Sequence, residues 1–394
     1  MNVPKPFVER GATVAESFSA RVLDGLNDGF FARTASSSSN VFQSDALLRG
    51  IEEHVLARSQ RLVLVGVTDS AGNAVALFPF VRRRKFGIAI LEAVDFGLVD
   101  YFAPTCFRDV KLSAQDTQRL WQAVLKVAPA AHAVTFKKLP RLLHHTPHAL
   151  SGADFLKPMG ASATTLYLRD AAGLPTKALD EASLSRKMRK TGKVLEKLGP
   201  LTFSEAATQA EVDSYIDALV IFRTARFSEL GRHDALLDPH VVAFYRALAD
   251  LRAPKPVGRV FALRAGDQTV AVAYGFSYGR VFTLIAPAIA PSKDLQAGSP
   301  GLVIMFKVVE WCRQRAFDVF DLSVGSLSYK SRFEAETTEL FEHQQALTPL
   351  GLIVVAEAAM RRRVRHMALK HPQLRPTLEK LSQKRWRREQ DANA

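Results

Sequence analysis

Residues 298–333 read GSPGLVIMFKVVEWCRQRAFDVFDLSVGSLSYKSRF, and this stretch says most about the fold. Ser299 is a typical helix N-cap, Pro300 suits the first helical position, and Gly301 keeps the backbone open there. Apolar side chains then recur at helical spacing as far as Cys312, and residues 317–322 alternate as a strand does. The stretch therefore predicts a helix, a strand and a polar loop ending in Tyr-Lys-x-x-Phe.

The two halves of the chain predict the same order of elements. In the second half, a strand and two helices precede three strands with short turns, which lead into the helix and strand above; the ranges are 201–205, 209–229, 239–251, 258–264, 268–278 and 280–286. The first half runs helix, three strands, helix and strand, at 44–58, 61–67, 74–81, 87–94, 114–127 and 131–136, with turns expected at 69–73 and 82–85. We expect residues 139–160 to connect the halves, and a short strand at 164–168.

This repeated order predicts an α/β (α+β) protein made of two copies of one fold, each a mostly antiparallel mixed sheet flanked by helices. We expect an N-terminal domain at 1–150, a C-terminal domain at 151–350 and a basic, partly helical tail at 351–394.

Composition predicts a soluble protein. The 394 residues are 47% hydrophobic and 23% charged, and no run approaches the ~18 apolar residues that cross a bilayer. The first residues lack the apolar core of a signal peptide, and the two cysteines, Cys106 and Cys312, lie far apart within apolar stretches. We therefore expect reduced core cysteines and a cytoplasmic protein.

Positive charge is concentrated near the end of the chain. The net charge is +14, and residues 361–394 hold 11 Lys/Arg against 3 Asp/Glu, a net +8. That tail is either a solvated, partly helical segment or a surface for nucleic acid such as tRNA, for the inner face of an anionic membrane, or for a polyanionic substrate. A helix predicted at 184–198 places Arg186, Lys190, Lys193 and Lys197 on one face, which is again either solvated or a contact for an acidic ligand.

The stretch also resembles a known family. The residues that carry this resemblance are Pro287, Ser299-Pro300-Gly301, Phe320-Asp321, Gly325 and Tyr329-Lys330-x-x-Phe333, together with 40–44, 77–80 and 222–230. The order of elements is that of the GNAT acyltransferases. The motifs resemble the GNAT branch named for the cellulose-biosynthesis acetyltransferase CelD, also called BioF2-like, and the Fem-type peptidoglycan aminoacyltransferases are near relatives with the same tandem plan. The loop 289–298 differs from the usual Arg/Gln-x-x-Gly-x-Gly/Ala pyrophosphate loop.

The resemblance implies an acyltransferase that uses acetyl-CoA or another acyl-CoA, with an amino sugar or glycan precursor of the cell envelope or exopolysaccharide as acceptor. An aminoacyl-tRNA-dependent transferase of Fem type is the first alternative. A non-catalytic module for anionic polysaccharide or membrane is the second.

Acyl transfer to an amine needs a grip on the donor, a route for the amine proton and stabilisation of an oxyanion. The helix N-terminus at Gly298, Ser299 and Gly301 offers free N–H groups to a pyrophosphate, and Lys293 could add a charge. The alternative is a capped core helix without a ligand.

Four further side chains are candidates for the chemistry. Asp321 ends an apolar strand, where a carboxylate is costly unless paired: it pairs with Lys330 or caps the loop, or it orients or deprotonates the acceptor. Tyr329 either protonates the leaving thiolate or packs. Lys330 either holds a phosphate or carboxylate or neutralises Asp321, and Arg226 is either an ion-pair partner or an acceptor contact.

Three histidines close in sequence, His144, His145 and His148, have spacings that could bind a metal ion. A Cys or carboxylate ligand is not placed near them in the sequence, so we expect no metal site. The common nucleophile and P-loop motifs are also missing from the sequence, which a direct transfer does not need.

Overall fold

The computed structural model describes residues 17–30, 40–57, 59–85, 87–107, 112–170, 172–176, 192–231, 234–292, 295, 298–325 and 335–370. In the first half the elements are β1 (Phe18–Val22), η1 (Val41–Gln43), α2 (Asp45–His54), β2 (Arg61–Asp69), β3 (Ala74–Lys85), β4 (Ile88–Ala93), β5 (Thr105–Cys106), α3 (Ala114–Val127) and β6 (Ala133–Pro140). Then follow β7 (Lys157–Tyr167), η2 (Glu196–Leu198), β8 (Leu201–Glu205), α5 (Gln209–Glu229), η3 (Ala235–Leu237), α6 (Pro239–Leu248), β9 (Gly258–Ala265), β10 (Gln268–Tyr278), β11 (Val281–Ile289), α8 (Pro300–Gln314), β12 (Val319–Val324), β13 (Glu336–Ala346) and α9 (Gly351–Lys370).

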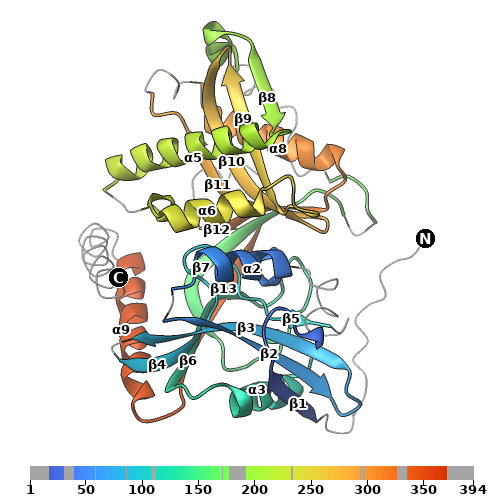
Figure 1. The fold of residues 1–394 in the computed structure, drawn as a ribbon, viewed down its shortest axis with the longest axis vertical. Helices are drawn as coiled ribbons and strands as arrows, with labels where there is room; N and C mark the ends of the chain where they lie inside the picture. The colour runs from blue at the N-terminus through green and yellow to red at the C-terminus, as the bar shows by residue number, and fades with distance from the viewer. Residues whose placement is uncertain are drawn as a thin grey trace.

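The expected mixed α/β architecture with two similar units is confirmed. Within the described residues, the strands form one 13-stranded sheet in the order β1-β2-β3-β4-β6-β13-β7-β12-β11-β10-β9-β8, with β5 paired to β3. In each unit an antiparallel meander ends in a strand that pairs in parallel with the strand after the next helix. These parallel pairs are β4 with β6 across α3, and β11 with β12 across α8. Figure 1 shows the two units one above the other, with β7 and β13 where they meet.

The two units exchange strands at their junction. β7 follows β6 in the chain but pairs antiparallel with β12 of the second unit, whereas β13 follows β12 and pairs antiparallel with β6 of the first. β7 and β13 also pair with each other, which makes the sheet continuous. Each unit is therefore completed by a strand that does not follow it directly in the chain, β13 beside β6 and β7 beside β12.

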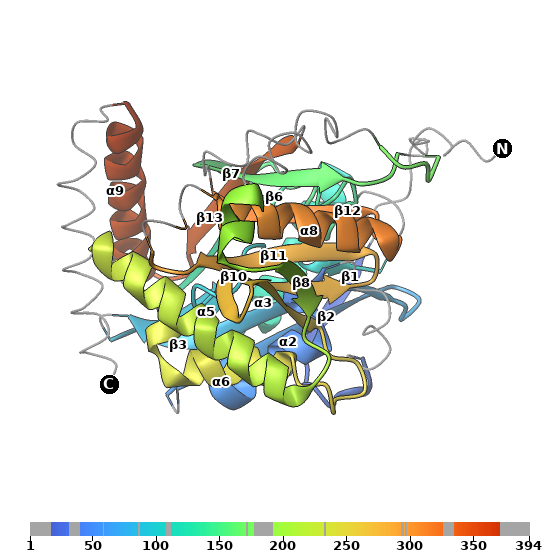
Figure 2. The same ribbon diagram turned by 90° about the horizontal axis from the view of Figure 1, so that it is seen from above.

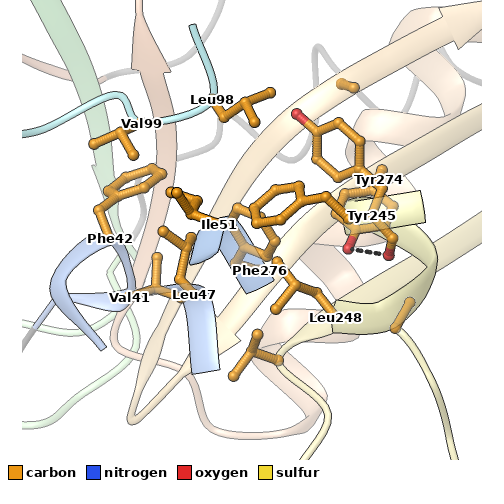
Figure 3. Packing of buried hydrophobic residues seen from close by; sticks show 14 of the residues in the cluster. Val41, Phe42, Leu47, Ile51, Leu98, Val99, Tyr245, Leu248, Tyr274 and Phe276 are labelled. Atoms are coloured by element: carbon orange, nitrogen blue, oxygen red, sulfur yellow. Dashed lines mark hydrogen bonds between the residues drawn. The ribbon is translucent and has the colours of Figure 1, made fainter. Parts of the chain in front are cut away.

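The helices bury apolar surface on both faces of the sheet. One core lies between α8 and the strands of the second unit, and another lies around Trp121 of α3 in the first. A third core joins the units, because α2 packs against α6. In Figure 3 Phe42 of η1 and Leu47 and Ile51 of α2 lie near Tyr245 of α6 and Phe276 of β10.

Several expected element limits need correction. Residues 82–85, expected as a turn, belong to β3, because Arg83 forms an ion pair with Glu92 of β4 that satisfies its charge within the sheet. The expected connection 139–160 is shorter, since β6 runs to Pro140 and β7 begins at Lys157. The short strand expected at 164–168 is thus part of an 11-residue strand. The helix 114–127 has the expected limits.

The helix α9 lies at the edge of the first unit, beside β13 (Figure 1). Val354 is buried with Ile90 of β4, Lys85 pairs with Glu357 at 3.0 Å, and Arg362 pairs with Glu342 of β13 at 3.2 Å. Among the described residues, no helix is both long enough and apolar enough to cross a membrane.

Candidate active site

The two central strands of the second unit separate partway along their length. β11 and β12 pair in parallel only from Val281 with Val319 to Thr283 with Asp321, although β11 continues to Ile289. β12 is irregular beyond Asp321, where Ser323 adopts a left-handed conformation with φ 64°. The strands therefore open a gap that starts at Asp321.

A pocket of about 490 Å³ lies at the far end of β11. Its lining residues come from β11 and the segment after it (287–291), from the start of α8 (299–302 and Met305), and from α5 (Phe222, Arg223, Arg226, Phe227 and Glu229). α5 and α8 lie on opposite sides of β11 in Figure 2. The pocket thus lies at the end of β11 between α5 and the start of α8.

The N-terminus of α8 opens into this pocket, but its cap differs from the expectation. Ser299 precedes the helix in a left-handed conformation (φ 45°) and makes no side-chain capping bond. Its carbonyl accepts hydrogen bonds from the amides of Leu302 and Val303. The Gly301 amide has no hydrogen-bond partner in the described part of the chain, and an added Cβ there would lie 3.1 Å from Ile289. Gly301 therefore presents a donor at the positive end of a helix.

Gly298 has a different role from Ser299 and Gly301. It is buried, its amide donates to the carbonyl of Leu295, and an added Cβ would lie 2.5 Å from Leu195. Gly298 thus shapes the turn before α8 by close packing, while Ser299 and Gly301 line the pocket.

The α5 side of the pocket carries two arginines with different surroundings. Arg223 forms two hydrogen bonds, of 2.7 and 3.0 Å, with the buried carboxylate of Asp234. Arg226 is 56% exposed and pairs with Glu229 at 3.2 Å, a contact that water weakens. Arg226 therefore pairs with Glu229 and also lines the pocket.

Asp321 is held by partners that its sequence neighbourhood does not show. Its side chain is 0% exposed and accepts hydrogen bonds from the Tyr101 hydroxyl at 2.9 Å, the Ser323 amide at 2.6 Å and His144 Nε2 at 2.8 Å. Tyr101 and His144 both belong to the first unit. Of the side chains that bind Asp321, His144 is the least buried, with 10% of its surface exposed.

A second carboxylate lies close to Asp321. Asp100 accepts a hydrogen bond from the Ser323 hydroxyl, and burial raises the pKa of Asp100 although Lys138 opposes the shift. Burial and the charge of Asp321 raise the pKa of Tyr101 well above its ordinary value, so this phenol stays protonated. Acids, a histidine and a lysine thus meet at the junction of the units.

The three histidines have different partners and do not form one site. His144 contacts Asp321, His145 stacks on Tyr167 and pairs with Glu336, and His148 is buried with its Nε2 2.6 Å from the Pro140 carbonyl. Among the described residues, no group of three or more metal-ligating side chains comes together.

Several candidate residues lie outside the described part of the chain, namely Tyr329, Lys330, Lys293, Arg186 and Lys190. The end of the helix expected at 184–198 is described: Leu195 is buried and Lys193 is exposed, as its amphipathic pattern predicts. Leu198, in the 3-10 turn η2 that follows, is 50% exposed.

Residues 182–331 match the model of the acetyltransferase (GNAT) domain family. This part of the chain is a GNAT domain. The protein is accordingly an acyltransferase, and the GNAT domain implies an acyl-CoA donor in general. The match covers η2 to β12 with α5, α6 and α8, so the pocket and Asp321 both belong to the GNAT domain.

One solved structure extends the likeness of the fold beyond the matched domain, to 80% of the chain. FemX has a TM-score of 0.53 with 8% identity, over 80% of this chain and 94% of that one. This likeness shows the fold and confirms the expected relationship to Fem-type proteins at that level. A tandem GNAT protein from the clavulanic acid biosynthesis pathway (TM-score 0.43, 10% identity, 84% and 99% covered) and L-PGS from Bacillus licheniformis (0.43, 13%, 79% and 95%) are also similar. No curated protein sequence matches the chain significantly.

Proposed function

We propose that this GNAT protein transfers an acyl group from acyl-CoA to the amine of an amino sugar or glycan precursor in cell-envelope or exopolysaccharide synthesis. The observation that carries the donor assignment is the pocket at the far end of β11, which Gly301 and Arg226 line together with apolar side chains. A helix N-terminus with a cation beside it suits a pyrophosphate, and the opened strands can take an extended pantetheine arm. The acceptor class rests on the CelD-like resemblance alone.

The bound donor would supply an activated thioester, and the chain would bind and orient it. Residues 287–291 and Met305 offer apolar contacts to the arm, and the start of α8 would hold the phosphates. The second unit is therefore the donor unit in this proposal, and the first unit shapes the acceptor side through the contacts it makes with Asp321.

A charged variant with a matched neutral control tests the donor site. Acetyl-CoA at about 100 times its dissociation constant should stabilise the wild-type protein by about 2.7 kcal/mol, a rise of a few degrees in Tm. Gly301→Asp places a carboxylate against the phosphates and should abolish the rise. Gly301→Asn has almost the same size without the charge, so it controls for the tight contact with Ile289 and should keep much more of the effect. Unchanged Tm with acetyl-CoA and with longer acyl-CoAs would contradict the proposal.

An aminoacyl-tRNA donor is the competing function, favoured by the fold similarity to FemX and by the net charge of +14. The same assay separates the two. Stabilisation by charged tRNA without any response to acyl-CoA would decide for the tRNA-dependent transferase.

We also infer that α9 and the basic segment after it contact an anionic membrane surface. Leu352, Ile353, Met360 and Met367 are 51–63% exposed and fall within one sector of about 100° of the helix. The net +8 of residues 361–394 adds charge of the sign that anionic lipids attract. The face opposite to this apolar stripe is the one that Val354 packs onto the sheet.

A further inference from the structure

The turn that carries His144 has an unusual backbone for its residue types. Leu143 and Thr146 exchange two backbone hydrogen bonds of 2.9 and 2.8 Å, which closes a two-residue hairpin turn around His144 and His145. Both histidines are left-handed, with φ of 49° and 62°. Such turns normally hold Asn-Gly, Asp-Gly or Gly-Gly, because Gly, Asn and Asp adopt the left-handed conformation at the lowest cost.

Costly backbone conformations at non-glycine residues persist where the side chains have a task. Here the turn points one imidazole into the junction between the units, where His144 meets Asp321 and its side chain keeps 10% of its exposure. The second imidazole, of His145, stays 61% exposed over Tyr167. The costly backbone conformation of this turn therefore places His144 beside Asp321.

The hydrogen bonds define which nitrogen of His144 is available. Asp321 accepts hydrogen bonds from the Tyr101 hydroxyl and the Ser323 amide, and because a carboxylate only accepts, we assign the proton of its contact with His144 to Nε2. Nδ1 is then the basic nitrogen, and it has no hydrogen-bond partner among the described residues. The ring of Tyr101 stands edge-on to the imidazole at 6.3 Å and limits its rotation.

The pair lies in line with the proposed donor pocket. Asp321 faces Thr283 across the last parallel pair before β11 and β12 separate. Pro287, where the pocket lining on β11 begins, is four residues farther on, about 13 Å along a strand. A thioester arm that follows the opening from α8 therefore runs toward the end where Asp321 and His144 lie.

We propose that His144 is the general base of the transfer, and that Asp321 is a positioning residue that holds its tautomer; this inference rests on the proposed function. The free amine attacks the thioester carbonyl, the new C–N bond forms, and Nδ1 of His144 takes the amine proton. The C–S bond then breaks, and His144 passes the proton that it took from the amine to the leaving thiolate, which departs as the free thiol and leaves the imidazole neutral.

Other titratable groups surround the pair, and they would shape its pH dependence. They are Asp100 and Tyr101 between β4 and β5, Lys138 on β6 with Asp95 at 2.8 Å, His145 in the same turn, Tyr167 on β7 and Glu336 on β13.

The tautomer test needs neither donor nor acceptor. In protein labelled with ¹⁵N-histidine, the His144 signals, assigned by their loss in His144→Asn, should show a protonated Nε2 and an unprotonated Nδ1. Asp321→Asn should disturb this pattern. A wild-type His144 that carries its proton on Nδ1 in the neutral ring would overturn the inference, whatever the acceptor is.

The kinetic test uses the turn itself for its control. Asn adopts the left-handed conformation readily, so His144→Asn and His145→Asn should both fold. Thiol release from acetyl-CoA with glucosamine should fall about 100-fold or more in His144→Asn, with unchanged binding of acetyl-CoA and loss of the acid limb of kcat/KM against pH. His145→Asn should retain the wild-type rate and the acid limb of the kcat/KM profile.

The outcomes separate the two proposals. A wild-type protein that neither binds nor consumes acyl-CoA contradicts the proposed function, and the base assignment is withdrawn with it. A wild-type protein that does both, alongside a His144→Asn variant of equal rate and unchanged pH profile, contradicts only the role of His144.

Discussion

His148 is the residue whose surroundings most directly couple stability to pH. Its Nδ1 accepts a hydrogen bond from the Leu150 amide at 3.2 Å, and its other nitrogen donates to the Pro140 carbonyl. Protonation would set two N–H groups against each other, and burial lowers the pKa of His148 to about 4 from 6.5. The neutral imidazole is therefore part of the core of the first unit.

This gives a stability prediction with a definite sign. Below about pH 6.5 the His148 side chain is protonated in the unfolded chain but stays neutral in the folded protein. The contribution of His148 to the free energy of unfolding is therefore fully present above pH 6.5 and falls by about 3 kcal/mol as the pH drops toward 4. Denaturant unfolding from pH 7.5 to 4 should show the loss. His148→Gln keeps a donor for Pro140 and should flatten the slope, while His240→Gln, on an exposed histidine, should not. Equal slopes in all three proteins would disprove this assignment.

Single residues also show the limit of reading a site from sequence. The motif singled out Asp321 and placed it at the end of an apolar strand, but β12 runs on to Val324 and only its pairing with β11 ends at Asp321. Its partners Tyr101 and His144 lie 220 and 177 residues away. His144 attracted attention only as a metal ligand, and its pairing with an acid could not be seen without the fold.

At the scale of elements, α9 carries the clearest prediction about a partner. The triple change Leu352→Ser, Ile353→Ser and Met360→Ser should reduce binding to vesicles containing phosphatidylglycerol at least tenfold, because each apolar side chain contributes about 1.5–3 kcal/mol when fully buried. Vesicle sedimentation measures this, and the bound fraction should also fall as salt rises.

The double change Leu174→Ser and Leu237→Ser, at exposed apolar positions elsewhere, should bind vesicles as the wild type does. Equal binding to neutral phosphatidylcholine vesicles, or tRNA binding without vesicle binding, would contradict the membrane contact.

The ends of a helix or strand agree with the sequence-based prediction where capping residues and apolar periodicity define them. The side chain of Ser113 caps α3 by accepting a hydrogen bond from the Asp116 amide, and the apolar residues of α3 recur at helical spacing. The helix therefore has the bounds that the sequence predicts, 114–127. The run Arg82 to Lys85 looked like a turn because it is charged. It extends β3 because Arg83 finds Glu92 on β4, and such cross-strand pairs are invisible before the register is known.

On the scale of the whole molecule, the exchanged strands and the shared core predict that the two units unfold together. Phe42 of the first unit is 0% exposed and contacts Tyr101 and Phe276, with ring centroids 5.8 and 6.2 Å away. Phe42→Ala should cost about 3–5 kcal/mol and shift one cooperative transition for the entire protein. Calorimetry and circular dichroism would measure this unfolding transition.

Phe78→Ala serves as the control within the first unit, since Phe78 is equally buried but packs in the core beside α3. One cooperative molecule requires both variants to show a single, lowered transition. A second transition that appears in either variant at the wild-type Tm would show that the units unfold independently.

The sequence by itself determined the order of helices and strands, the repetition of that order, and the resemblance that led to a GNAT domain. Those properties depend on local periodicity, capping residues and turns, which neighbouring residues decide. Only the tertiary structure decided that β7 and β13 change places and that His144 meets Asp321. Both depend on pairing between segments far apart in the chain, and a burial pattern shows that a strand has neighbours but not which ones they are.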